Sequence, residues 1–271
     1  MKYVDILTSL LKSFSSINNM FDRINYNLDF KSHCEKLKCL QDKLSISFIT
    51  PTRNEASHLP MNLMSIKYVA KVCNVPVETI VVDYESTDGT PDIARKIGAK
   101  VISVEKPGVG YASYIGVLNA SGDIVIRTDA DVIMTPSAIF EIQKIFNEKS
   151  KVLVATVGHI YYPINFVENW VAYAYDAYIR KPYNTTGYFI AFRKEIADKV
   201  NFDPKLRAND DWDFGMRAYK TFGIGRLYYN HYIAVLVSSR YIKKKGLLRY
   251  VCENTGIIKV VPVPYTQLAM S

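Results

Sequence analysis

Three polar segments, each directly after an apolar stretch, carry the side chains best suited to chemistry. They are Thr50-Pro51-Thr52-Arg53-Asn54-Glu55, Asp83-Tyr84-Glu85-Ser86-Thr87-Asp88-Gly89-Thr90 and Thr128-Asp129-Ala130-Asp131. Carboxylates that lie close together raise one another's pKa values unless a cation lies between them. Hard oxygen ligands select Mg²⁺ or Mn²⁺, which commonly bind through one or two carboxylates and the phosphates of a substrate. If the three segments converge, these residue types predict a divalent-metal site for a phosphate-bearing ligand.

The apolar stretches before these segments are typical of strands, and helical stretches separate them. Strands are expected at 45–50, 79–83, 100–104 and 123–127, and helices near 58–73, 91–97 and 111–119. The alternation predicts a mostly parallel sheet covered by helices on both faces. Ligands of such sheets bind at the carboxyl ends of strands. The loops after Ile49, Val82 and Arg127 are therefore expected to form the site.

The three polar segments and two further motifs, five in all and in this order along the chain, resemble those of the family-2 inverting glycosyltransferases, which have the GT-A fold. The further two are Gly187-Tyr188-Phe189-Ile190-Ala191-Phe192-Arg193, similar to the family's glycine-to-arginine strand, and Asn209-Asp210-Asp211-Trp212-Asp213, similar to its acidic helix start. The resemblance covers about residues 45–240. It implies an α/β fold with a GT-A-type, Rossmann-like, mostly parallel sheet flanked by helices. It also implies transfer of a sugar, with inversion, from a UDP- or GDP-sugar to an acceptor hydroxyl.

The resemblance implies a donor site at the ends of the first strands. Pro51, Arg53 and Glu55 are expected to line the pocket for base and ribose. Asp83 is expected to accept a hydrogen bond from uracil or guanine, although a role in ending the strand and shaping a turn is the alternative. Asp129 is expected to reach the ribose or a metal-bound water.

The same resemblance implies that Asp131 binds Mn²⁺ or Mg²⁺ directly and that the ion stabilises the departing diphosphate. His231 is a second candidate ligand, but a satisfied histidine at a strand end is the favoured interpretation. Lys106, in a glycine-bearing segment before a helix, either contacts phosphate or belongs to a plain turn. Arg240 suits a bidentate contact with the donor diphosphate.

On the acceptor side, Asp211 is expected to be the general base that takes the proton of the attacking hydroxyl. Residues assigned to acceptor binding are Gly187, Trp170, Asp210 and Trp212. Asp210 also suits a helix start through the helix dipole alone, and Gly187 suits a close backbone approach. Trp170 belongs to an aromatic-rich stretch at 160–183, which predicts an acceptor groove or a membrane-facing lip. A glycan, a lipid-linked molecule or a protein could be the acceptor.

Departures from the family pattern and rival functions narrow the interpretation. Tyr84-Glu85 replaces a commoner Asp-Gly pair, which leaves the base open. The Gln-x-x-Arg-Trp motif of processive polysaccharide synthases is absent from the sequence, so addition of a single sugar is favoured. A catalytically inactive sugar-nucleotide-binding protein and a nucleotidyltransferase are the alternatives. No nucleic-acid partner is predicted, because clustered carboxylates repel phosphate without a metal, despite the net charge of +8.

Residues 1–44 are predicted to be an N-terminal helical extension, followed by a transferase domain at 45–240 and a basic C-terminal segment at 241–271. Leu7, Phe14, Phe21 and Leu28 repeat every seven residues, with Leu10, Ile17 and Ile24 three residues after the first three of them. This heptad seam predicts a helix of about 25 residues that buries its apolar stripe. Packing on the main domain is the first expectation, a homodimer contact the second and a peripheral membrane contact the third.

Composition sets broader limits. The chain has 271 residues, of which 49% are hydrophobic and 22% charged, as in globular proteins. Its cysteines are Cys34, Cys39, Cys73 and Cys252, whose spacing does not fit a zinc site, so free thiols in a reducing compartment are expected. The sequence shows neither a secretory leader pattern nor 18 consecutive apolar residues. A cytoplasmic protein is predicted, with peripheral membrane contact as an addition.

Overall fold

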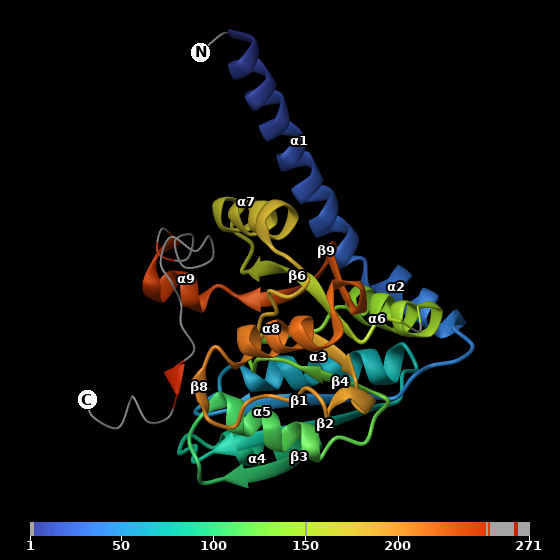
Figure 1. The fold of residues 1–271 in the computed structure, drawn as a ribbon, viewed down its shortest axis with the longest axis vertical. Helices are drawn as coiled ribbons and strands as arrows, with labels where there is room; N and C mark the ends of the chain where they lie inside the picture. Colours follow the sequence, from blue (N-terminus) through green and yellow to red (C-terminus); the bar gives the residue numbers. More distant parts are fainter. Residues whose placement is uncertain (1–2, 150, 248, 250–262, 265–271) are drawn as a thin grey trace.

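The structure is a computed structural model that describes residues 3–149, 151–247, 249 and 263–264 (Figure 1). Its centre is an eight-stranded sheet in the order β3-β2-β1-β4-β7-β6-β9-β5. The four strands on one side are parallel to one another: β3 (Lys100–Val104), β2 (Val77–Tyr84), β1 (Ile46–Thr52) and β4 (Ile124–Arg127). The helices that connect these strands are α3 (Leu59–Val72), α4 (Thr90–Ile97) and α5 (Val109–Leu118). The predicted α/β fold class is confirmed.

The other half of the sheet mixes directions. β7 (Ile190–Arg193) is antiparallel to β4 and to β6 (Val154–Tyr162), β9 (Leu227–Ser238) is parallel to β6, and β5 (Val132–Ile133) is antiparallel to β9. The remaining longer helices are α6 (Pro136–Glu148), α7 (Phe166–Ala174), α8 (Asp210–Phe222) and α9 (Arg240–Lys245). Shorter elements are a π-helical turn η1 (Tyr175–Ile179), the 3-10 turns η2 (Lys194–Ile196) and η3 (Ile224–Arg226), and the two-stranded pair of β8 (Leu206–Ala208) and β10 (Val263–Pro264).

Alternating side chains of the parallel strands form two cores, one on each face of the sheet. Phe48 and Ile126 belong to a buried cluster that includes side chains of α3 and α6, whereas Ile49 and Val125 belong to another that includes side chains of α5 and α8. Strands buried on both faces read as apolar runs, as Ile80-Val81-Val82 of β2 and Ile124-Val125-Ile126 of β4 do. Because β1 lies between β2 and β4 in parallel register, the carboxyl ends of all three meet at one edge.

Helices α1 (Tyr3–Leu28) and α2 (Phe30–Cys39) precede the sheet, and α1 projects well beyond the body of the molecule in Figure 1. The predicted packing of the seam on the main domain is wrong for Phe21 and Leu28, because these side chains are 48% and 41% exposed. The buried face of α1 contains Ile24 of the seam together with Met20 and Asn27, which lie outside it. The side chains of Leu7, Leu10 and Phe14 lie outside the described part.

Polar side chains explain this rotation of α1. Asn27 accepts a hydrogen bond from the backbone N–H of Ala234 (2.8 Å) and donates to the carbonyl of Tyr232 (2.8 Å). Both partners belong to β9, whose register with β6 shifts near this point. Backbone groups left unpaired by an irregular strand need partners when buried. Asn27 therefore fixes which face of α1 meets the sheet. This orientation decides which positions of the heptad pattern are buried and which are exposed.

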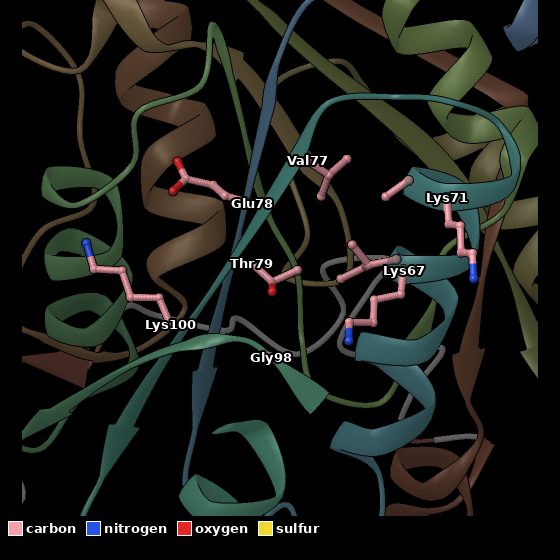
Figure 2. A pocket seen from close by; sticks show the side chains of 9 residues that line it. Lys67, Lys71, Val77, Glu78, Thr79, Gly98 and Lys100 are labelled. Atoms are coloured by element: carbon pink, nitrogen blue, oxygen red, sulfur yellow. The ribbon is translucent and has the colours of Figure 1, made fainter. Parts of the chain in front are cut away.

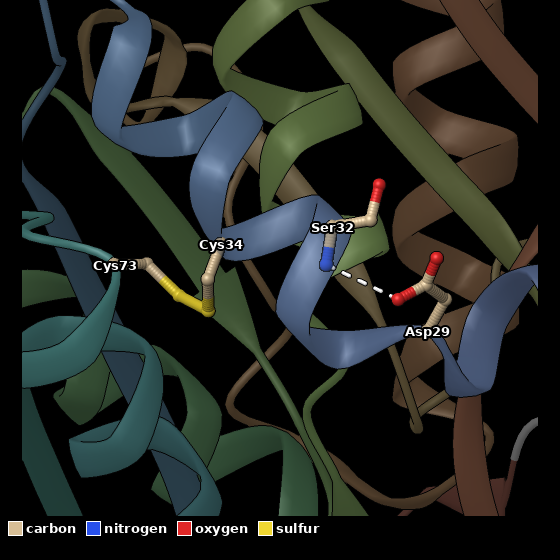
Figure 3. The surroundings of a disulfide bond; sticks show 4 residues. All are labelled: Asp29, Ser32, Cys34 and Cys73. Atoms are coloured by element: carbon tan, nitrogen blue, oxygen red, sulfur yellow. Dashed lines mark hydrogen bonds between the residues drawn. A yellow bond between two sulfur atoms is a disulfide. The ribbon is translucent and has the colours of Figure 1, made fainter.

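A disulfide joins Cys34 of α2 to Cys73 at the end of α3 (Figure 3). This corrects the expectation of free thiols, which only Cys39 meets among the described cysteines; Cys252 lies outside the described part. The pairing joins cysteines 39 residues apart, so it depends on the docking of α2 against α3. At the start of α2, Asp29 accepts a hydrogen bond from the backbone N–H of Ser32 (3.1 Å; Figure 3). Within the part of the chain that is described, no helix is both long and apolar enough to cross a membrane.

Candidate active site

The loops after β1 and β2 are cross-linked by hydrogen bonds at the carboxyl edge of the sheet. Asp83, only 3% exposed, accepts bonds from the hydroxyls of Thr52 (2.9 Å) and Ser86 (2.6 Å) and from the N–H of Ser86 (3.1 Å). Ser86 in turn accepts a bond from the backbone N–H of Asn54 (2.8 Å). Asp83 thus shapes the loop that it belongs to, as the alternative interpretation expected. Its Oδ2 atom, with a single donor from this loop, keeps capacity for one more.

Asp131 and Glu55 share one cation, the guanidinium of Arg240. Arg240 lies 2.6 Å from Asp131 through Nε and donates from Nη1 and Nη2 to the two oxygens of Glu55 (2.7 and 2.8 Å). Burial of Asp131 and the nearby charge of Asp129 raise the pKa of Asp131 to about 6, against the lowering effect of Arg240. The structure therefore brings Glu55, Asp129 and Arg240, which are predicted to bind the donor, together with Asp131, which is predicted to bind the metal.

Arg127, the last residue of β4, lies at the centre of the site and was missed by the sequence analysis as a site residue. It is 2% exposed, donates to Asp129 (2.5 Å) and to the carbonyl of Gly187, and lies 3.8 Å from Asp210. Burial alone would lower the pKa of Arg127, but Asp129 and Asp210 outweigh it and raise the pKa. An arginine that ends a buried apolar strand needs several acceptors. That position was the signal available in the sequence.

Asp211 is held by two backbone donors at the start of α8. The N–H of Gly187 donates to its Oδ2 atom (2.6 Å) and the N–H of Trp212 to its Oδ1 atom (2.8 Å). Burial and the neighbouring carboxylate of Asp210 raise the pKa of Asp211 to about 6. Asp210, 2% exposed, accepts a hydrogen bond from Ser113 (2.9 Å). A carboxyl group with a raised pKa in a polar site suits proton transfer near neutral pH.

Gly187 must be a glycine in this arrangement. A Cβ atom there would overlap the guanidinium of Arg127 and lie 2.8 Å from the carboxylate of Asp129. Gly187 therefore lets one strand end approach the acidic loop while its own amide holds Asp211. Trp212, the next residue of α8, is 42% exposed beside this group.

Two assigned residues lie elsewhere. His231 lies beside Tyr173 (6.3 Å between ring centroids), where burial and the charge of Arg23 lower its pKa. Along β9, His231 comes six residues before Val237, and each residue of a strand advances by about 3.3 Å. Val237 pairs with Val132, the neighbour of Asp131. The structure does not support His231 as a ligand together with Asp131. Trp170 packs against a cluster of α1 and α7 side chains that includes Met20 and Ile24.

The three remaining donor-side residues are placed less directly. Pro51 lies in β1 opposite Val82, at the same edge as Asp83. The guanidinium of Arg53 lies over the ring of Tyr84 (4.7 Å), and the ammonium group of Lys106 lies over Tyr111 (4.9 Å). Both basic side chains belong to exposed residues, so both remain accessible to an anionic ligand.

A divalent ion fits the acidic group. Among the described residues no three His, Cys, Asp or Glu side chains are arranged as a complete metal site. Mg²⁺ and Mn²⁺ do not require one, because they bind through one or two carboxylates and the phosphates of the substrate. The carboxylate of Asp131 is paired with the guanidinium of Arg240, and a metal ion bound there would take the place of this contact.

A hollow of about 620 Å³ lies near the amino ends of strands β2 and β3, opposite the carboxyl ends that form the candidate active site (Figure 2). Val77, which begins β2, and Lys100, which begins β3, line it together with Lys67 and Lys71. Its carboxylate, Glu78, is occupied by the hydroxyl and the N–H of Ser121 (2.7 and 2.6 Å). The hollow is therefore separate from the candidate active site.

Comparison with known proteins places the chain in a family. Residues 47–202 match the family described as Glycosyl transferase family 2. The chain belongs to this family. It is 35% identical over 133 residues to 4,4'-diaponeurosporenoate glycosyltransferase of Staphylococcus haemolyticus, a match that covers 46% of the chain and 34% of that relative. An uncharacterized glycosyltransferase of Rickettsia conorii is 37% identical over 111 residues, covering 40% and 36%. The matched part of the chain thus spans little more than a third of these relatives.

Solved structures share the fold of this family-2 chain at low sequence identity. Glucosyl-3-phosphoglycerate synthase of Mycobacterium tuberculosis, crystallised with Mn²⁺, UDP-glucose and phosphoglyceric acid, has a TM-score of 0.55 and 21% identity, over 83% of this chain and 85% of that one. The mannosyltransferase PcManGT of Pyrobaculum calidifontis, in complex with GDP-Man and Mn²⁺, has a TM-score of 0.56 and 19% identity, over 93% and 77%. Residues 1–349 of TarS of S. aureus give a TM-score of 0.58 at 18% identity, over 78% and 65%.

Proposed function

We propose that this family-2 chain transfers a sugar from a UDP- or GDP-sugar to an acceptor hydroxyl by a metal-assisted single displacement with inversion. The observation that carries the proposal is the grouping of Asp129 and Asp211 around the buried Arg127 and Gly187, with Asp131 close enough to Asp129 to be affected by its charge. Two of these carboxyl groups have pKa values raised to about 6. Family membership and solved structures with UDP-glucose and GDP-Man support the donor class.

In the proposed mechanism Asp211 takes the proton from the acceptor hydroxyl as the oxygen attacks the anomeric carbon. The backbone N–H groups of Gly187 and Trp212 orient its carboxylate, because each donates to a different one of its two oxygens. Arg127, paired with Asp129 and 3.8 Å from Asp210, offsets the negative charge around Asp211, so that Asp211 can act as a base near neutral pH. A group held in place before the reaction needs no reorganisation during it.

The donor is proposed to lie along the loops after β1, β2 and β4. Asp131, with Asp129 beside it, would hold Mn²⁺ or Mg²⁺, which as a Lewis acid stabilises charge on the leaving diphosphate. Arg240 would then exchange its contact with Asp131 for the diphosphate, where a planar guanidinium suits two phosphate oxygens. Pro51, Arg53, Glu55 and Asp83 are proposed to surround the nucleoside, and Lys106 to lie near its phosphates.

Thermal unfolding with a panel of UDP- and GDP-sugars tests the donor proposal. We expect a matching donor to raise the melting temperature only with Mn²⁺ or Mg²⁺, since a ligand of the folded state stabilises it. Asp131→Ala should abolish the rise in melting temperature that the donor produces with the metal. Asp92→Asn, which removes an exposed acid paired with Arg95 on α4, is the matched control and should leave it unchanged.

Turnover of the same donor tests the base. Asp211→Asn should retain the donor-induced thermal shift and lose transfer or donor hydrolysis by at least about 10²-fold, the usual contribution of a positioned base. Full turnover by this variant would refute the assignment of Asp211. Donor stabilisation that persists in EDTA would refute the role of the metal.

A further inference from the structure

An exposed apolar surface spans α1, α7 and the loop before α7. It consists of Phe21, Ile164, Phe166 and Val167, which are 48%, 55%, 48% and 51% exposed. We call it the α1–α7 surface. The rings of Phe21 and Phe166 lie 6.2 Å apart between centroids, so the two helices contribute to one continuous patch. Large exposed apolar patches mark places where a protein meets another surface.

Positive charge borders this surface. Ile242 of α9 packs in one cluster with Ala172 of α7, so α9 lies directly against α7. The next three residues of α9 are the exposed lysines Lys243, Lys244 and Lys245. Within the described ranges none of the three forms an ion pair with a carboxylate; Lys245 donates to the hydroxyl of Tyr241 (3.1 Å). Figure 1 shows α7 between the projecting helix α1 and α9.

The α1–α7 surface lies at the margin of the candidate active site. The hydroxyl of Tyr162 donates to the carbonyl of Asp131 (3.2 Å), and Ile164 follows two residues later. From the other side, Arg240 at the start of α9 contacts Asp131 itself. A surface that contacts both α7 and α9 would therefore lie at the edge of the candidate active site.

We propose that the α1–α7 surface and the lysines of α9 dock the protein on an anionic lipid bilayer, and that the acceptor is an amphiphile held in that bilayer. Aromatic and aliphatic side chains in the middle with lysines at the margin match the layering of a membrane surface, with acyl chains below anionic headgroups. The acceptor part of the proposal rests on the proposed glycosyl transfer; the docking part does not.

A second copy of the chain fits this surface less well. In a twofold dimer each copy presents the same patch to the other, so the partner brings to the interface the same apolar side chains and the same three lysines. An anionic bilayer supplies the opposite charge for the same lysines.

Sedimentation with vesicles tests the docking. The full chain is mixed with vesicles of pure phosphatidylcholine or of phosphatidylcholine with added phosphatidylglycerol, an anionic lipid. We expect capture by the anionic vesicles that weakens with salt. Phe166→Ser with Val167→Ser, and separately Lys243→Glu with Lys244→Glu, should each lower the partition coefficient by about tenfold or more.

Ile224→Ser is the matched control, because Ile224 is 49% exposed but belongs to η3, outside the α1–α7 surface. It should bind vesicles as the parent chain does. Equal capture of the parent chain and both double variants, or no capture by anionic vesicles at low salt, would overturn the docking. So would a dimer in analytical ultracentrifugation that the Phe166 and Val167 changes dissociate, since a second copy would then cover the surface.

Donor-induced thermal stabilisation, measured on the same variants, separates the two proposals. A chain that binds vesicles but no nucleotide sugar would refute the transferase proposal and keep the docking. A chain that binds nucleotide sugar but no vesicles would refute the docking and leave the transferase proposal standing. If vesicles bind but transfer to vesicle-borne amphiphiles is no faster than to soluble glycosides, the assignment of the acceptor class fails.

Discussion

At the scale of single residues, the candidate site places the carboxyl groups of Asp129, Asp210 and Asp211 around the buried guanidinium of Arg127. Carboxylates at the strand ends could be predicted from the sequence, because acids directly after apolar runs are conspicuous. The role of Arg127 could not, because its partners come from three separate segments: it donates to Asp129 and to the carbonyl of Gly187, and it forms an ion pair with Asp210. His231 was a candidate ligand only through the family resemblance, and its place in β9, beside Tyr173, agrees with the favoured interpretation of a strand histidine.

The raised pKa of Asp211 predicts how stability depends on pH. Its pKa is about 6, above the ordinary value of 3.8, so between these values the folded chain binds a proton that the unfolded chain has lost. The stabilisation from this group is therefore present below about pH 4 and lost as the pH rises through about 6. Asp211→Asn does not titrate. Between pH 5 and 8 we expect its melting temperature to rise relative to the parent chain by on the order of a few degrees.

Thermal unfolding in EDTA is the measurement, since a bound cation would mask the effect. Asp213→Asn is the matched control for loss of an acid from the first turn of α8, and it accounts for any effect of helix charge. A melting-temperature difference between Asp211→Asn and the parent chain that stays constant over this range would contradict the assigned origin of the shift.

At the scale of elements, the first half of the sheet was predictable from its residues, whereas in the second half only β7 was indicated, through the resemblance of residues 187–193 to the family's strand. β1 to β4 are runs of β-branched residues with turn signals between them, and their observed bounds differ from the predicted ones by at most two residues. The aromatic stretch at 160–183 was assigned to the acceptor side as a whole. In the structure it is divided between β6, α7 and η1, and some of its rings pack against α1. Sequence periodicity does not show that division, because it depends on which surface each segment meets.

A buried ionic group ties α1 to the body, and the heptad pattern gave no sign of it. Arg23, 1% exposed, donates to Asp176 (2.8 Å) and to the carbonyl of His159 (2.7 Å). Asp176 also lies 3.1 Å from His159 Nδ1 and 3.6 Å from Arg180. Burial alone would raise the pKa of Asp176, but His159 and Arg23 outweigh it and hold the pKa well below the usual value. Arg180 continues the group to Thr186 (3.1 Å), next to Gly187.

Removing different members of this group should have unequal effects. Asp176→Leu leaves two buried arginines without their shared carboxylate, and we expect it to lower the free energy of unfolding by about 3–5 kcal/mol. Arg23→Met should lower it by less, because Asp176 keeps Arg180 and His159 as partners. The loss in the double variant should be smaller than the sum of the two single losses. Urea unfolding measures all three; additive losses would contradict the ionic coupling.

At the scale of the whole molecule, the N-terminal extension shares its core with the transferase sheet. Leu37 and Cys34 of α2 belong to the same buried cluster as Ile46 and Phe48 of β1. The match to the glycosyltransferase family begins only at residue 47. The division at residue 44 was predicted from a change in sequence pattern, and such a change does not reveal a shared core.

This shared core predicts that the extension and the site unfold as one unit. The two tryptophans report on different parts: Trp170 packs near Met20 and Ile24 of α1, and Trp212 stands beside Asp211. Trp212→Phe leaves fluorescence from the first region and Trp170→Phe from the second. We expect the two variants, after correction for their own stability by circular dichroism, to give fluorescence transitions that coincide with loss of secondary structure.

Adding Arg23→Met to each single-tryptophan variant makes the test decisive. If α1 and the sheet form one cooperative unit, a change in the buried ionic group should lower both fluorescence midpoints by the same amount, although Trp212 lies in a different helix from any member of that group. A separately folding extension would instead show an early transition at Trp170 with the midpoint at Trp212 unmoved. In that case the stability of the proposed active site would not depend on α1, and the apolar surface that α1 shares with α7 could open without disturbing catalysis.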